Sequence, residues 1–154
     1  MPFLGWCQIY RIDPSTHKIA YSEITEVDGT PKDELYDRAR KWFDLQYGYD
    51  DNVTMSEHKE NGELHIHAYL PLKINMRSCR AAYTMVLSVK DGKYRYTITN
   101  FFFYHPESKS LAFEHRHLHP RMQIYAKTDE KVQVLIAGIH QKMIRKITAS
   151  MIDW

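Results

Sequence analysis

Histidine is the residue type best able to do chemistry in this 154-residue sequence, which contains nine imidazoles that can titrate near neutral pH or bind metals. Three of them surround the dipeptide Asn61-Gly62, which favours a two-residue hairpin turn. In that register His58 and His65 are cross-strand neighbours, and His67 lies two residues further along the same face. Imidazoles placed in this way could ligate Zn²⁺. The alternative is that they are polar side chains on a solvated strand.

A second set of histidines lies in the least regular segment, residues 105–127. His115, His117 and His119 alternate with other residues, so on a strand they would project to one side. Neither set comes with a carboxylate and water arrangement that would indicate catalysis. We therefore expect no cofactor, with zinc as the alternative that these six histidines leave open.

Signatures of catalytic sites are missing from the sequence. It has no Gly-x-Ser-x-Gly, no His-Glu-x-x-His, no phosphate-binding loop and no dinucleotide fingerprint. The only two cysteines, Cys7 and Cys79, form no Cys-x-x-Cys unit, and their spacing leaves open whether they pair. The sequence therefore favours a domain without enzymatic activity.

The charge and hydropathy patterns narrow the range of partners and compartments. A formal net charge of +2 is only mildly basic, whereas dedicated nucleic-acid modules concentrate basic residues in a patch or stripe. No apolar run is long enough to span a membrane, and the first residues lack the features of a signal peptide. We expect a cytoplasmic protein if the sequence is read as it stands, or an exported one if a native leader is missing. The length predicts a single domain over residues 1–154.

The hairpin centred on Asp91-Gly92 is the element around which the chain is expected to be organised. A two-residue turn with positive φ at both positions predicts these cross-strand pairs: Lys90 with Lys93, Val89 with Tyr94, Leu87 with Tyr96 and Met85 with Ile98. The last three pairs would share an apolar face, and the opposite face would be polar. We take the polar face as the candidate binding surface, with these residues: Tyr69, Lys90, Lys93, Arg95, Thr97 and Thr99. The run Phe101–Tyr104 is apolar at every position, so we expect it to be covered on both sides.

The remaining elements follow from caps, turns and periodicity. Residues 6–27 predict strand, turn and strand, with Tyr10, Ile12, Ile24 and Val27 in the core. A helix capped by Thr30 ends at Tyr47-Gly48, with Arg38, Arg40 and Lys41 facing water. A hairpin over residues 53–72 ends its pairing at Pro71, and a last helix over about 128–152 starts at Thr128.

This order of elements predicts an α+β fold. A strand, a helix, four antiparallel strands and a second helix would place both helices on one face of an antiparallel sheet. The core would span about 19–104, followed by the C-terminal helix.

Two segments resemble a known family. Residues 27–42 fit the pattern Val-x-Gly followed by Lys-x-Glu-Leu-Tyr-x-x-Ala-x-x-Trp, and residues 83–98 resemble the same family's central hairpin. The family is an uncharacterised bacterial domain of unknown function with a fold like that of the TATA-box-binding protein, and the match covers roughly residues 20–104. The resemblance implies this topology and no catalytic residues, and many relatives carry export leaders.

Three functions remain as hypotheses. The first is a small non-enzymatic binding or interaction domain with the polar face and the segment 105–127 as contact surfaces; its partner is unknown, and a protein is one candidate. The second is a metal-binding protein or metal-dependent enzyme that uses the histidines. The third is nucleic-acid binding through the basic strand ends, against which Glu60 and Glu63 argue.

Overall fold

The structure is a computed structural model that describes residue 12 and residues 18–105 and 110–144. In chain order its elements are β1 (Tyr21–Glu26), α1 (Lys32–Tyr47), β2 (Thr54–His58), the short 3₁₀ helix η2 (Lys59–Asn61), β3 (Glu63–Ile74), β4 (Arg77–Lys90), β5 (Lys93–Tyr104), β6 (Leu111–Ala112) and α2 (Arg121–Ile144). The sheet has the order β1-β5-β4-β3-β2, and every neighbouring pair is antiparallel. β6 pairs with β5 beyond the end of β1.

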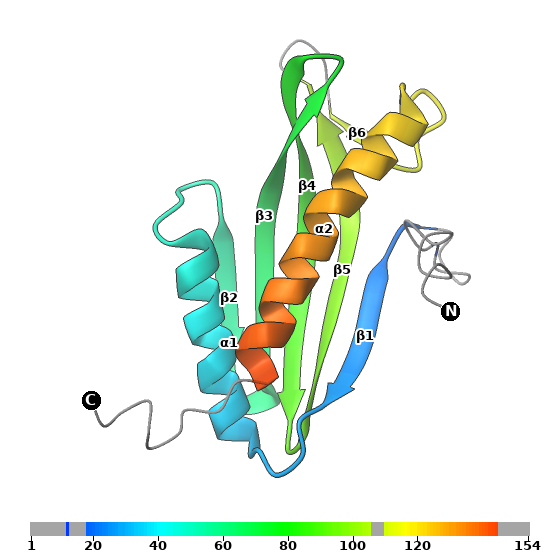
Figure 1. The fold of residues 1–154 in the computed structure, drawn as a ribbon. Coiled ribbons are helices and arrows are strands. Elements are labelled where there is room, and N and C mark those ends of the chain that lie inside the picture. Colours follow the sequence, from blue (N-terminus) through cyan, green and yellow to red (C-terminus); the bar gives the residue numbers. More distant parts are fainter. Residues whose placement is uncertain (1–11, 13–17, 106–109, 145–154) are drawn as a thin grey trace.

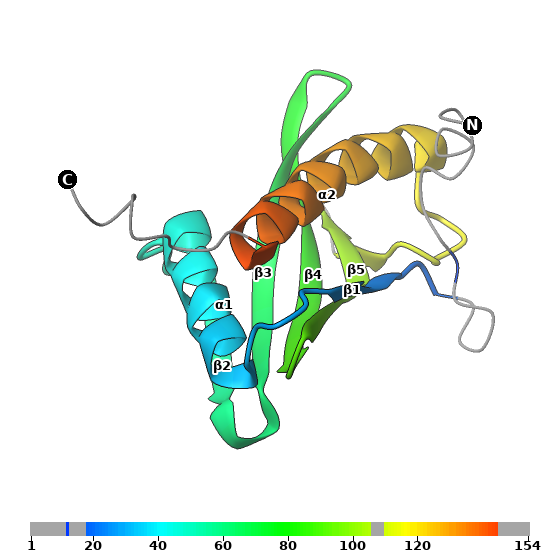
Figure 2. The ribbon, with the colours of Figure 1, turned by 60° about the horizontal axis from the view of Figure 1, so that its bottom comes forward.

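Both helices pack on the same face of this sheet, as predicted. Figures 1 and 2 show α1 in front of the β2 side and α2 running diagonally across the central strands. The helix-facing side chains form one apolar cluster, in which Leu35, Met85, Ile98 and Ile139 are completely buried. The α+β prediction is therefore confirmed. We call the opposite side of the sheet the open face, because no described helix covers it.

The register of the central hairpin is the one predicted from Asp91-Gly92. All four predicted pairs form, from Lys90 with Lys93 to Met85 with Ile98. The turn itself differs, because φ is positive at Gly92 alone. The Gly92 peptide forms two hydrogen bonds outside the hairpin, to Val27 and Thr30.

A β-bulge interrupts β5 near its end. The pairing changes from Thr84 with Thr99 to Ala82 with Phe102, so β5 contains one extra residue, and Asn100 there has a φ of 57°. The extra residue reverses which side chains face the helices. Phe101 and Phe103 are buried as a result, whereas Phe102 remains 39% exposed on the open face. The prediction that this run is covered on both sides was wrong.

The hairpin at Asn61-Gly62 has a longer loop than predicted. Lys59–Asn61 form η2, and Gly62 follows with a φ of 69°. His58 therefore pairs with Glu63 and Ser56 with His65, two residues away from the predicted register. A shift by two keeps every side chain on its predicted face. A Cβ at Gly62 would lie 2.6 Å from the Val89 carbonyl oxygen, so this close approach to β4 requires glycine.

β3 and β4 form a hairpin that the sequence did not reveal. Its turn residues, Asn75 and Met76, both have positive φ, and methionine gives no turn signal at such a position. β3 also continues through Pro71, which pairs with Arg80. β2 pairs with β3 no further than His67, so Pro71 has a free edge on one side and needs no donor there. The predicted end of pairing at Pro71 was therefore wrong.

The first helix begins at Lys32, one residue later than predicted, and Pro31 occupies the N-cap position. Arg38 is buried rather than facing water. It forms an ion pair with Glu34, and its Nη1 donates a 2.6 Å hydrogen bond to the Met143 carbonyl oxygen near the end of α2. A guanidinium is favourable there because the carbonyls of a last helical turn have no partners within the helix.

The second helix begins at Arg121, seven residues before the predicted start. Thr128 is buried within this helix and does not cap it. The following residue, Asp129, accepts a 2.8 Å hydrogen bond from the Tyr21 hydroxyl on β1. The predicted end of this helix lies outside the described residues.

The β4–β5 turn docks against the loop that joins β1 to α1. Val27 N donates to the Gly92 carbonyl oxygen, and Gly92 N donates to that of Thr30, both at 2.8 Å. The Asp91 carboxylate accepts a 2.8 Å hydrogen bond from Lys32 N, at the start of α1. A carboxylate there satisfies a free helix donor and also favours the positive end of the helix dipole. The hairpin thus supplies the cap that Pro31 cannot provide.

We predict that Asp91→Ala destabilises the protein. The substitution leaves the Lys32 amide without its acceptor, and loss of such a cap costs about 1 kcal/mol of the free energy of unfolding. Urea unfolding followed by circular dichroism measures the change. Asp28→Ala, an exposed position of the same loop, is the control and should change stability by less than about 0.5 kcal/mol. Equal effects of the two substitutions would contradict the capping role.

Candidate functional site

The predicted binding residues lie on the open face of the sheet. Alternation along β4 and β5 directs Lys90, Lys93 and Arg95 away from the buried positions that face the helices. Thr97 and Thr99 follow on the same side and are half-buried, and the Thr97 hydroxyl contacts that of Ser22 on β1 at 3.3 Å. The strands therefore bring these residues onto one continuous surface.

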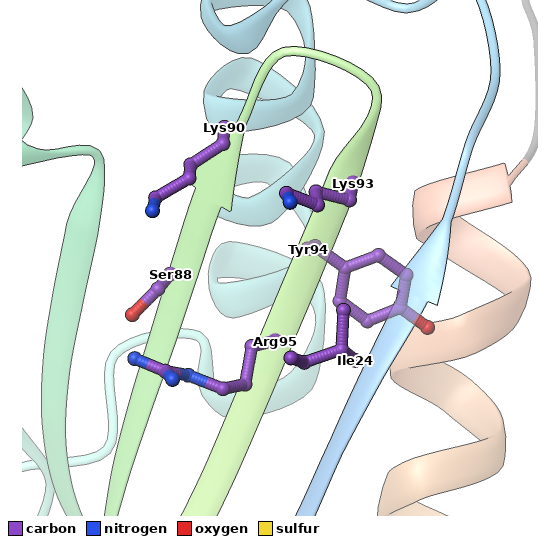
Figure 3. Close-up of a pocket in the computed structure, with 6 residues that line it drawn as sticks. All are labelled: Ile24, Ser88, Lys90, Lys93, Tyr94 and Arg95. Atoms are coloured by element: carbon purple, nitrogen blue, oxygen red, sulfur yellow. The ribbon is translucent and has the colours of Figure 1, made fainter.

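A shallow pocket of about 100 Å³ opens at the hairpin end of this surface. We call it the cation pocket, and its lining residues are Ile24, Ser88, Lys90, Lys93, Tyr94 and Arg95. Figure 3 shows the two lysines, Ser88 and Arg95 projecting on the side away from the helices. The Tyr94 ring is buried, and its hydroxyl contacts His140 Nδ1 on α2 at 3.0 Å. Ile24, predicted as a core residue, is 60% exposed here.

The three cations of the pocket have no acidic partner among the described ion pairs. Glu26 of β1 pairs across strands with Lys93 but forms none of these ion pairs. The carboxylate in the row of Arg95 belongs to Glu63, on β3 beyond Ser88. It accepts hydrogen bonds from His65 Nε2 at 3.0 Å and from Ser88 Oγ at 3.4 Å. Three cations brought together without an ion-pair partner favour binding of an anion.

A second group of residues on the open face was missed by sequence analysis. The Arg80 guanidinium lies 4.3 Å from the centre of the Tyr69 ring and 5.9 Å from that of Tyr104. Of these three, only Tyr69 was predicted. The β-bulge at Asn100 places Tyr104 on the open face, and the unrecognised β3–β4 hairpin brings Arg80 beside Tyr69. Neither feature has a clear sequence signal.

The first predicted metal-ligand set remains partly together. The rings of His58 and His65 lie 4.6 Å apart between centres, although the two residues are diagonal rather than directly paired. His67 instead contacts the Thr84 hydroxyl through Nδ1 at 3.1 Å. Within residues 18–105 and 110–144, no three histidine, cysteine or carboxylate side chains group as they would around a metal ion. Zinc binding by these residues stays a prediction.

The second predicted set lies in turns rather than on a strand. His115 and His117 have ring centres 5.3 Å apart, and His115 Nδ1 accepts a hydrogen bond from His117 N. His119 is exposed immediately before the cis peptide bond to Pro120. The strand geometry expected for this set was therefore wrong, because β6 ends at Ala112 and the chain then turns towards α2.

Comparison with known proteins identifies the family. Residues 21–104, from the first residue of β1 to the last of β5, match the model of the domain of unknown function DUF4468 with TBP-like fold. The chain belongs to this family. Among curated proteins, no sequence matches the chain.

Two solved structures share the fold of this DUF4468 domain. A TBP-like protein from Parabacteroides distasonis is 16% identical with a TM-score of 0.80, and the match covers 91% of this chain and 100% of that one. A DUF4468 family protein from Bacteroides ovatus is 12% identical with a TM-score of 0.71, and the match covers 92% and 94% of the two chains. At these identities the likeness establishes the fold only.

Among the described residues of this DUF4468 domain, no helix has both the length and the apolar character that crossing a bilayer requires.

We predict that Glu63 titrates below the ordinary glutamate value of 4.5, because the hydrogen bond from His65 lowers its pKa. Since the pKa is lowered in the folded state, this interaction stabilises the fold above pH 4.5 and is lost as the pH falls through the lowered pKa. An NMR titration should show the Glu63 pKa rising towards 4.5 in His65→Ala. His67→Ala is the control and should leave it unchanged. An unshifted Glu63 in the wild-type protein would refute the interaction.

Proposed function

We propose that this domain is a non-enzymatic binding module that takes up an acidic protein segment on the open face of its sheet. The observation that carries the proposal is the cation pocket, where Lys90, Lys93 and Arg95 border a concave surface and form no ion pair with a carboxylate of the described residues. A carboxylate entering it would replace repulsion among cations with charge-assisted hydrogen bonds.

The character of the surrounding surface supports a protein partner. Ile24 borders the pocket and is 60% exposed, and Phe102 is 39% exposed further along the same face. Val86, between them on β4, is half-buried. Apolar side chains next to charged ones suit a peptide, which presents both kinds of group.

The charge distribution favours an acidic protein segment over nucleic acid. Strand register and alternation give the open face two carboxylates, Glu26 and Glu63, and five cations: Lys73, Arg80, Lys90, Lys93 and Arg95. Glu26 pairs across strands with Lys93, so a continuous phosphate backbone crossing the pocket would meet a like charge. A short acidic side chain can enter the pocket and avoid both carboxylates.

We predict that a fluorescein-labelled acidic peptide about four residues long binds the protein at low salt, measured by fluorescence anisotropy. Binding should weaken as salt rises, because exposed charges are screened. The double variant Lys93→Glu/Arg95→Glu should weaken it at least about tenfold, since each reversal places a carboxylate in the pocket. The control Lys41→Glu/Lys131→Glu makes the same net charge change on exposed positions of α1 and α2.

Three outcomes would overturn the proposal. One is the absence of binding at about 50 mM salt, where electrostatic binding is strong. Another is an equal loss of affinity in both double variants, which would show that binding depends on net charge and not on the pocket. The third is that a single-stranded oligonucleotide of equal charge binds more tightly than the peptide and that Lys93→Glu/Arg95→Glu abolishes this binding. The ligand would then be nucleic acid and not an acidic protein segment.

A further inference from the structure

A second cationic site lies at the other end of the open face. We call it the Arg80 cluster, and it consists of Tyr69, Arg80 and Tyr104. The two tyrosine rings are 5.8 Å apart and nearly perpendicular, with an interplanar angle of 76°. The Arg80 guanidinium lies within contact of both rings. Cation–π contacts of this kind hold a guanidinium in a fixed place without neutralising it.

The held guanidinium keeps its hydrogen-bonding edge available. Among the described residues, Arg80 forms no ion pair with a carboxylate. It also borders an open pocket of about 450 Å³, whose lining residues are Ser78, Cys79, Arg80, Tyr104 and His105. The planar fork of a guanidinium matches the two oxygens of a carboxylate. The Arg80 cluster therefore has the form of a carboxylate-binding site.

The distance between the two cationic sites is set by β4. Arg80 and Ser88 are eight positions apart on this strand, and Ser88 pairs directly with Arg95 of the cation pocket. At about 3.3 Å per residue, the two sites lie about 26 Å apart. The open-face residues between them on β4 and β5 are uncharged: Ala82, Thr84, Val86, Thr97, Thr99 and Phe102.

We propose that the Arg80 cluster is a second anion-binding subsite, and that with the cation pocket it selects an extended protein segment whose acidic groups are about eight residues apart. This inference rests on the proposed function. The segment would place one acidic group in each subsite and lay its uncharged middle over the threonines and Val86. Once one end is bound, the other is held near its subsite at high effective concentration.

Peptides of defined spacing test the proposal on the whole chain. The first is the four-residue acidic peptide used above. The second carries two acidic clusters centred about eight residues apart on a neutral Ser/Thr spacer, and the third has the same charge with the clusters about three residues apart. We expect the second peptide to bind at least about tenfold more tightly than the first, and the third to show little of this gain.

Variants of the protein show which subsite is responsible for the gain in affinity of the second peptide. Arg80→Gln should abolish the gain of the second peptide while leaving the affinity of the first within about twofold. The control Arg116→Gln removes a cation from an exposed turn position and should preserve the gain. Thermal unfolding verifies that both variants fold as the wild-type protein does. A third variant, Tyr69→Leu, removes one ring that holds the guanidinium and should reduce the gain.

The failure of this inference is distinguishable from failure of the proposed function. If the first peptide does not bind, the proposed function fails. If it binds but the second peptide binds no more tightly, or if Arg80→Gln retains the gain, the cation pocket acts alone and the second subsite is refuted. An equal gain for both spacings would likewise refute it, because the effect would then come from total charge.

Discussion

The contact on which the rest of the structure depends is the docking of the β4–β5 turn against the loop between β1 and α1. Gly92 forms two backbone hydrogen bonds with that loop, and the Asp91 carboxylate caps the helix. Beside the same turn, the Gly62 carbonyl of the β2–β3 connection accepts a hydrogen bond from β4. Loops far apart in sequence are thus held together at one end of the sheet. Lys90 and Lys93 flank the docked turn, so the same hydrogen bonds fix the backbone of the cation pocket.

The residues that resemble the family pattern serve this docking and the core, on the opposite side of the sheet from the cations. Val27 bonds to the turn, and Leu35, Ala39 and Trp42 of the helix signature are buried against the strands. These positions determine the fold, so a match to them carries no information about a ligand. The open face can vary without disturbing that core, because strand side chains alternate between the two faces. The function proposed for this chain therefore rests on its open-face residues and not on the family match.

Sequence reasoning succeeded where local chemistry determines geometry. Asp91-Gly92 has a strong turn preference, and the pairs on either side of it, with their division into two faces, follow from that register. Sequence reasoning failed where tertiary contacts determine the backbone geometry. Asn75 and Met76 both adopt positive φ although neither is a glycine. Thr128 is of a residue type that often caps helices, but it is buried within a helix that begins at Arg121. For the site, the cations of the hairpin were predictable from alternation. Arg80 was not, because its ring partners come together only through the bulge and the unrecognised hairpin.

The β-bulge at Asn100 connects the fold to the proposed specificity. Before it, the even-numbered residues of β5 face the helices; after it, the odd-numbered ones do, which buries Phe101 and Phe103. Without the extra residue, Tyr104 would point to the helix side and Arg80 would lose one of its two rings. One residue in the left-handed conformation thus completes the core and also places an aromatic ring on the open face. The two ends of that face differ for this reason: the lysines and Arg95 stand on regular strands, whereas Arg80 has its second ring, that of Tyr104, only because β5 is irregular.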